Sequence, residues 1–178
     1  MADMTAKMLN NSDALTATMT PLTMSYLTPT EWDEKAHLFD GVCQEQMHVF
    51  ASERWQGMNT DCLHFKIDGE LVAGCLVMHR AAPLGLGGLA VCKWGPILLD
   101  VGAPNAQQLF GDVVDMLIQH YAVERRLMLS MLPRPQPAEQ NFAVALLQDR
   151  GFKEGAGLPF PNRYFVNVQL SDEDMRAS

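Results

Sequence analysis

The spacing of hydrophobic residues in the first third of the chain predicts a helical region. Thr28-Pro29-Thr30-Glu31 is typical of a helix start, because a threonine cap, a proline in the first turn and a glutamate that bonds back to the cap favour the same geometry. Apolar residues then recur at helical spacing to about Arg54, and Gly41 leaves open a break into two shorter helices. Trp55 ends the region. The positions on the apolar face are Trp32, Ala36, Phe39, Cys43, Gln46 or Met47, and Phe50.

Three strands are expected next. Cys62–Ile67 and Leu71–His79 flank Asp68-Gly69, which is the strongest short signal for a hairpin because a tight primed turn needs positive φ at both central residues. The second of these segments is almost continuously apolar, which is typical of a strand covered on both faces. Leu89–Leu99 is the third strand, and a Gly-Pro pair interrupts it.

The rest of the chain alternates between helices and short strands. The expected elements are a helix from Pro104 to Tyr121, a strand at Leu127–Leu132, a helix at Ala138–Arg150 and a strand at Tyr164–Leu170. Gly151 closes the second of these helices in the usual left-handed terminal position. The order of elements predicts a mixed α/β fold with one central, mostly antiparallel sheet flanked by helices.

The length of 178 residues suits one domain with a substantial core. Residues 1–24 are rich in Met, Thr, Ala and Asn without clear periodicity, and we interpret them as a mobile tail. Residues 25–171 form the single expected domain. Residues 172–178 are expected to begin a truncated C-terminal helix or a tail.

Charge and cysteine usage narrow the partners and the compartment. With 13 basic and 21 acidic residues the formal charge is −8, so the molecule repels phosphate backbones, and we expect no DNA partner. The four cysteines form no Cys-x-x-Cys pair and lie in apolar runs, which favours buried reduced thiols and a cytoplasmic location. The sequence has no apolar run long enough to span a bilayer.

The interrupted strand is the strongest indication of a binding site. Proline contributes no amide hydrogen and glycine no side chain, so the Gly95-Pro96 pair prevents an unbroken ladder on both sides of the strand. The backbone near Trp94 can then part from a neighbour and accept a ligand that lies beside it like an extra strand. A simple edge bulge is the alternative interpretation.

These elements resemble the acyl-N-acyltransferase (GNAT-like) fold, and more closely the first domain of Fem-type aminoacyltransferases of the FemA, FemB and FemX kind. The matching stretches span about residues 27–171. They are Trp55, the Asp68-Gly69 hairpin, Lys93-Trp94-Gly95-Pro96-Ile97-Leu98-Leu99-Asp100, Leu146-Leu147-Gln148-Asp149-Arg150-Gly151-Phe152 and Tyr164-Phe165-Val166-Asn167-Val168-Gln169-Leu170-Ser171. The resemblance implies a bacterial transferase that forms an amide on an amine acceptor, such as a peptidoglycan or other cell-envelope precursor. It implies acyl-coenzyme A or aminoacyl-tRNA as the donor.

The sequence also departs from these families. The Gln/Arg-x-x-Gly-x-Gly/Ala phosphate loop of acetyltransferases is replaced before Pro104 by Val101-Gly102-Ala103, and no lysine follows Trp55 closely. The chain ends where a Fem-type protein begins the helix to its second domain. Three hypotheses therefore stay open: an acyl or aminoacyl transferase, a non-catalytic module that pairs with a second copy or a second GNAT-like domain, and a coenzyme-A-dependent N-acetyltransferase.

Candidate site residues cluster at the interrupted strand. Amide formation needs positioning and backbone donors more than a side-chain nucleophile, so the backbone of Trp94, Gly95, Pro96 and Ile97 is the expected substrate-binding edge. Asp100 is the candidate catalytic base, or a cap of the following turn. The histidines show no metal-ligand spacing, and no metal is expected. Further candidate substrate-binding residues are Lys93, Arg134 and, through the resemblance, Trp55; solvated or core roles are the alternatives.

Overall fold

The computed structural model describes residues 21–83, 86–134 and 142–155. These residues form one six-stranded sheet in the order β1-β2-β3-β4-β6, with the short β5 also paired to β3. The pairs among β1 to β4 are antiparallel, and β6 runs parallel to β4. The strands are β1 Thr23–Leu27, β2 Asn59–Ile67, β3 Glu70–Ala81, β4 Gly88–Lys93, β5 Ile97–Leu98 and β6 Met128–Leu132. The predicted mixed, mostly antiparallel sheet is confirmed.

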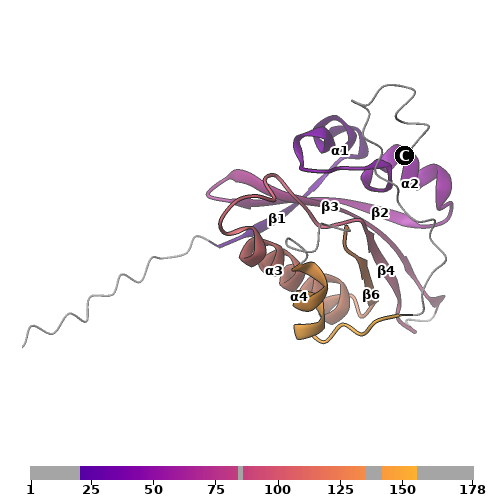
Figure 1. Cartoon of the computed structure of the whole chain (residues 1–178). Helices are drawn as coiled ribbons and strands as arrows, with labels where there is room; N and C mark the ends of the chain where they lie inside the picture. The colour runs from indigo at the N-terminus through magenta and orange to yellow at the C-terminus, as the bar shows by residue number, and fades with distance from the viewer. Residues whose placement is uncertain (1–20, 84–85, 135–141, 156–178) are drawn as a thin grey trace, which may run out of the picture.

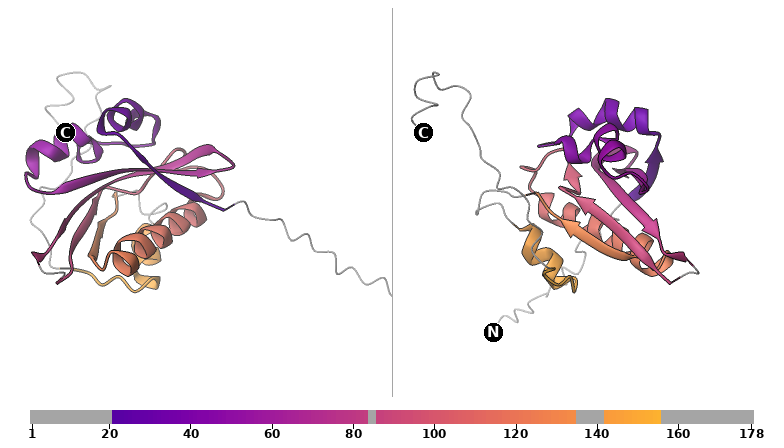
Figure 2. Two further views of the ribbon diagram at one scale, coloured as in Figure 1. Left: turned by 180° about the vertical axis from the view of Figure 1, so that it is seen from behind. Right: turned by 90° about the vertical axis from the view of Figure 1, so that its right-hand side faces the viewer.

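Helices cover both faces of the sheet (Figure 1). Helices α1 (Pro29–Lys35) and α2 (His48–Arg54) lie on one face, and α3 (Ala106–Leu117) and α4 (Ala143–Asp149) lie on the other, as the views from behind and from the side also show (Figure 2). Each face has its own buried apolar cluster. Trp32 and Phe39 anchor the cluster under α1, whereas Phe110 and Tyr121 anchor the larger one under α3.

The N-terminal helical region begins and breaks as its sequence indicates. Thr28 caps α1, its side chain accepts from the amide of Glu31, and the Glu31 carboxylate accepts from the Thr28 amide, so the predicted capping box is present. Gly41 has a φ of +62°, and two short 3-10 turns separate α1 from α2. Of the two alternatives for this region, the pair of shorter helices is therefore correct. The preceding strand β1 lacks a clear sequence signal and begins two residues before the expected domain boundary.

The hairpin and the interrupted strand are both confirmed. Asp68 and Gly69 take φ values of +53° and +84° between β2 and β3. The expected strand Leu89–Leu99 is two strands, β4 and β5, with Trp94, Gly95 and Pro96 between them. Both strands pair with β3, because Val77 lies opposite Cys92 and Gly74 lies opposite Ile97.

The later helices differ from the expectation mainly at their ends. Helix α3 begins at Ala106 instead of Pro104 and continues as a π-helix over Ile118–Glu124, which contains Tyr121. Helix α4 ends before Gly151, which has the expected left-handed φ of +84°. The expected start of this helix at 138–141, the strand at 164–170 and the helix opening at 171–174 lie outside the described residues.

Candidate functional site

Between β4 and β5 the sheet opens on one side, the side that faces β6. The amide of Trp94 donates to the carbonyl of Leu132 at 2.7 Å, next to Lys93 and Leu132, with which the register between β4 and β6 ends. Ile97 and Leu98 then pair with β3, on the side away from β6. The chain after Trp94 therefore moves apart from the end of β6.

A cavity occupies the opening. It has a volume of about 20 Å³, which is room for one water molecule. Its lining combines the interrupted strand with the end of β6 and with both helices of the α3 face. The lining residues are Asp40, Pro96, Ile97, Leu98, Val101, Phe110, Pro133, Arg134, Phe142 and Ala143. The predicted binding edge thus borders a real cavity, although a narrow one.

On its other side the break is sealed by Gln46. This side chain is fully buried, its Oε1 accepts from the Leu76 amide at 2.9 Å, and its Nε2 donates to the Lys93 carbonyl. One amide group therefore substitutes for the missing rungs between β3 and β4. The Trp32 indole donates to the Gln46 carbonyl at 2.6 Å and fixes the segment in place.

Lys93 is buried in an ion pair on the α2 face. Its Nζ lies 2.9 Å from Glu45 Oε1 and 5.5 Å from the centre of the Trp55 ring. Only 6% of the Lys93 side chain is exposed, so the solvated alternative for this residue is wrong. Lys93 and Trp55, two of the candidate substrate-binding residues, are thus neighbours on this face, and their role in binding stays a prediction.

Arg134 spans the opening from the end of β6 to the loop after α1. Its Nη1 lies 3.4 Å from the carbonyl oxygen of Asp40, and its guanidinium rests on Gly41 so closely that a Cβ there would overlap it. Asp40 is held in turn by β5 and its following turn, because its amide donates to Leu98 at 3.0 Å and its carboxylate accepts from the amide of Val101 at 3.0 Å.

Asp100 is exposed and caps a turn. Its Oδ1 accepts from the amide of Gly102 at 2.8 Å, which is the turn-capping alternative for this residue. Asp100 is absent from the cavity lining, whereas its neighbour Val101 belongs to it. Trp94 is partly buried and has a φ of +60°. Of the predicted site residues, the structure brings Pro96, Ile97 and Arg134 together at the cavity.

The sequence did not identify the segment 40–46 as part of the site. Asp40 and Gln46 hold β4, β5 and the following turn together, yet both lie in a stretch that reads as helix. One signal was present, since Gln46 is a polar residue at a position of the apolar helix face. A polar side chain on a buried face needs partners, and here they are the unpaired backbone groups of the broken strand.

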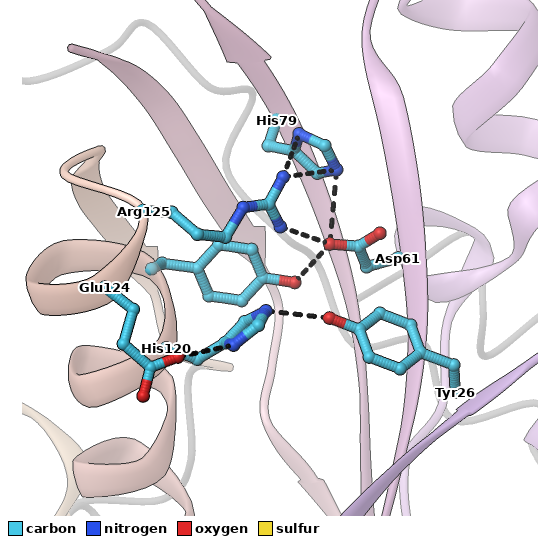
Figure 3. A network of polar contacts seen from close by, with 7 residues as sticks. Tyr26, Asp61, His79, His120, Glu124 and Arg125 are labelled. Atoms are coloured by element: carbon cyan, nitrogen blue, oxygen red, sulfur yellow. Dashed lines mark hydrogen bonds and ion pairs between the residues drawn. The ribbon is translucent and has the colours of Figure 1, made fainter.

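A second polar cluster lies between β2, β3 and the π-helix (Figure 3). Asp61 Oδ2 accepts from the Tyr121 hydroxyl at 2.7 Å and from Arg125 Nη1 at 2.8 Å, and it lies 3.2 Å from His79 Nε2. Burial raises the pKa of Asp61, but the hydrogen bond from Tyr121, the charge of His79 and the hydrogen bond from Arg125 outweigh it and hold this pKa below its usual value. The cluster ties the π-helix to the sheet.

Beside this cluster, the Tyr26 hydroxyl lies 2.7 Å from His120 Nε2, and His120 Nδ1 lies 3.4 Å from Glu124. Burial, followed by the charge of Asp61, raises the pKa of Tyr26, so its phenol stays protonated near neutral pH. Within the described residues no three His, Cys, Asp or Glu side chains are placed to hold a metal ion. None of the helices in that part of the chain is long and apolar enough to cross a bilayer.

Solved structures of acyltransferases share this fold. A crystal structure of FemX superposes with a TM-score of 0.58 at 16% identity over 74% of this chain and 32% of that chain. A ribosomal-protein-alanine N-acetyltransferase from Brucella melitensis biovar Abortus 2308 gives 0.51 at 16% identity over 81% and 99% of the two chains. A possible acetyltransferase from Clostridium difficile 630 gives 0.51 at 9% identity over 81% and 98%. No protein-family model and no curated protein matches the sequence.

These similarities establish the fold. The described residues form a GNAT-like α/β domain, as the resemblance implied. The chain spans about a third of the FemX chain that it matches, whereas the matches to the other two structures cover almost their whole length. Identities between 9% and 16% carry no information on substrate, so the Fem-type assignment stays a proposal.

Proposed function

We propose that this chain is an N-acyltransferase domain that binds its acyl donor in the opening between β5 and the end of β6. The observation that carries the proposal is the one-sided break, in which Gln46 preserves the sheet toward β3 while a cavity remains toward β6. A break that only relieved strain would need no cavity on one side. The similarity in fold to N-acetyltransferases and to FemX supports this assignment.

The reaction is the formation of an amide. The nitrogen of an amine acceptor attacks the donor carbonyl, a C–N bond forms, and the C–S bond of a thioester or the C–O bond of an aminoacyl ester breaks. The proton lost by the amine passes to the leaving thiol or hydroxyl through solvent. The domain contributes mainly by holding the donor beside the backbone of Trp94 to Ile97, since positioning alone supplies a large part of such a rate enhancement.

The donor and acceptor follow from the same proposal. The donor is an acyl-coenzyme A or an aminoacyl-tRNA, and the acceptor is a small molecule or a cell-envelope precursor such as that of peptidoglycan. The four thiols are free and three of them are buried, which is consistent with work in a reducing cytoplasm. A Fem-type role, with a second GNAT-like domain or a second copy of the chain, is the finer form of this proposal.

Donor binding tests the proposal directly. The cavity must widen to take an acyl group, and a donor at a hundred times its Kd then stabilises the fold by about 2.7 kcal/mol. A thermal-shift series with acetyl-coenzyme A, longer acyl-coenzymes A and an aminoacyl-tRNA measures this effect. Transfer of a radiolabelled acyl group to amine acceptors then measures activity.

Two matched substitutions localise the binding. Val101 lines the cavity and is partly exposed, so Val101→Trp fills the opening without disturbing a packed core. Val144 is 46% exposed on α4, does not line the cavity and gives the control Val144→Trp. We expect the donor shift to vanish in the first variant and to persist in the second. Equal shifts in both variants would place the donor elsewhere.

A binding or oligomerisation module is the second candidate. The observation that favours it is the small volume of the cavity, about 20 Å³, which holds no acyl group without a rearrangement. No stabilisation by any donor, together with a concentration-dependent dimer in sedimentation, would support this module and contradict the transferase.

A further inference from the structure

We infer that Arg134 is the receptor for a phosphate group of the acyl donor, and that Gly41 is the place where its guanidinium rests when no donor is bound. This inference deepens the proposed function, because it names the chemistry that the opening recognises. The phosphate is common to both donor sources, the pyrophosphate of coenzyme A and the phosphodiester of a tRNA end.

The positive charge of Arg134 has few partners in the structure. Arg134 is partly buried at the cavity, and a proline precedes and follows it in the sequence. Among the described residues it forms no ion pair, and its one hydrogen bond is a long contact of 3.4 Å to the Asp40 carbonyl. By contrast, Arg125 and Arg150 each contact a carboxylate at 2.8 Å or less. A guanidinium has five N–H donors, so Arg134 retains most of its capacity for an anion.

The guanidinium of Arg134 rests against Gly41. Gly41 combines a positive φ with the absence of a Cβ, and the guanidinium lies where that Cβ would be. The contact bridges the opening between β5 and β6, since Asp40 is bonded to Leu98 and Arg134 follows β6. In this position Arg134 narrows the cavity from its rim. A phosphate that draws the guanidinium off Gly41 both gains a partner and widens the opening.

The turn before α3 has no glycine-rich loop that could bind a phosphate instead of Arg134. The turn before α3 reads Val101-Gly102-Ala103-Pro104-Asn105 and lacks the glycine-rich phosphate loop of acetyltransferases. Asn105 makes no side-chain cap on that helix. A cation that faces the same opening from β6 supplies the missing recognition, and an arginine suits phosphate because its planar fork donates two parallel hydrogen bonds.

Three ligands and four proteins test the inference. The ligands are acetyl-coenzyme A, S-acetylpantetheine, which lacks every phosphate, and a short aminoacylated RNA that ends in the tRNA acceptor sequence. The proteins are the full chain and its variants Arg134→Gln, Arg134→Lys and Arg80→Gln. Arg80 is an exposed arginine on β3, six residues and so about 20 Å from Gly74, where β5 pairs, and serves as the matched control.

Calorimetric titration should show that Arg134→Gln loses affinity only for ligands that carry a phosphate. Arg134→Gln should weaken the phosphate-bearing donor about tenfold, because a hydrogen bond to a charged group is lost, and should not weaken S-acetylpantetheine, which has no phosphate for Arg134 to hold. Arg134→Lys should recover part of the affinity, and Arg80→Gln should bind like the parent chain. An equal loss for both ligands in Arg134→Gln, or no loss for either, overturns the inference. Whether the coenzyme or the RNA shows the selective loss tells which source supplies the phosphate.

Inorganic pyrophosphate distinguishes a failure of the transferase proposal from a failure of the anion site at Arg134. If no donor binds the parent chain, the transferase proposal fails, and pyrophosphate titrated into ¹⁵N-labelled protein then tests the anion site alone. Shifts at Gly41 and the Arg134 side chain that disappear in Arg134→Gln support the site. The absence of such shifts in the parent chain overturns it.

Discussion

The interrupted strand loses backbone partners on two sides, which differ in structure: the side toward β3 is closed by a side chain, and the side toward β6 is open. Toward β3, the buried amide of Gln46 bridges Leu76 and Lys93, and β5 resumes pairing at once. Toward β6, pairing ends at the bond from Trp94 to Leu132, and a cavity follows. A buried backbone group without a partner is costly, so the bridge made by Gln46 keeps the closed side of the sheet intact, whereas the open side leaves a cavity.

The residues that meet at the two sides differ accordingly. The closed side is rigid and specific, with the rings of Trp32 and Phe39 stacked 5.8 Å apart above it. The open side borders a cavity whose lining includes Arg134, two prolines and the rings of Phe110 and Phe142, and the Arg134 guanidinium rests on Gly41. The closed side therefore holds the sheet together and the open side borders the cavity, so substitutions on the two sides should have different effects.

Breaking the closed side should have the largest effect on stability. Gln46→Leu keeps the size of the side chain but removes its hydrogen bonds to the buried Leu76 amide and the Lys93 carbonyl. At about 1–3 kcal/mol for each group, we expect a loss of about 2–6 kcal/mol in the free energy of unfolding, measured by urea denaturation. Gln44→Leu, an exposed position in the same turn, is the control. A loss below 1 kcal/mol in Gln46→Leu would show that the bridge is dispensable.

Acid should weaken the closed side to an intermediate extent. His64 lies on β2, opposite Gly74 of β3, and packs on Trp32 and Phe39. Burial, followed by the charges of Lys35 and Lys66, lowers the pKa of His64 to about 4. The unfolded chain binds this proton near pH 6.5, so the contribution of His64 is present above that pH and is lost as the pH falls toward 4. His64→Phe should show a flatter decline in unfolding free energy between pH 7 and pH 5. Identical pH profiles would contradict this assignment.

The sequence predicts the backbone events of this site better than its side-chain contacts. Gly95-Pro96, Asp68-Gly69 and the Thr28 cap each act through local geometry, which neighbouring residues determine, and all three are found as expected. The roles of Gln46 and Lys93 depend on partners that lie 30 and 48 residues away in the chain, Leu76 and Glu45. Periodicity contains no information on such pairs. It placed Gln46 on an apolar face but could not say what that amide would bridge.

On the open side, Gly41→Ala tests the contact that spans the opening. The added methyl group overlaps the Arg134 guanidinium, and alanine at a φ of +62° is itself strained, so we expect a loss of about 1–2 kcal/mol in unfolding free energy. In an Arg134→Gln background the overlap is relieved and only the strain remains. A double-mutant cycle by urea denaturation measures the difference, which should be at least about 0.5 kcal/mol. Strictly additive losses would mean that Arg134 does not rest on Gly41 in solution.

The smallest effect is expected at Asp100, where the open side meets the next turn. Its carboxylate accepts from the Gly102 amide, and an asparagine oxygen can accept the same bond. Asp100→Ala should therefore lose about 0.5–1.5 kcal/mol of unfolding free energy, whereas Asp100→Asn should stay within about 0.5 kcal/mol of the parent chain. Because the two variants differ in the turn but both lack a carboxylate, their transfer rates separate capping from proton transfer. A rate that falls only in Asp100→Ala identifies a cap; a rate that falls equally in both variants supports the predicted catalytic base.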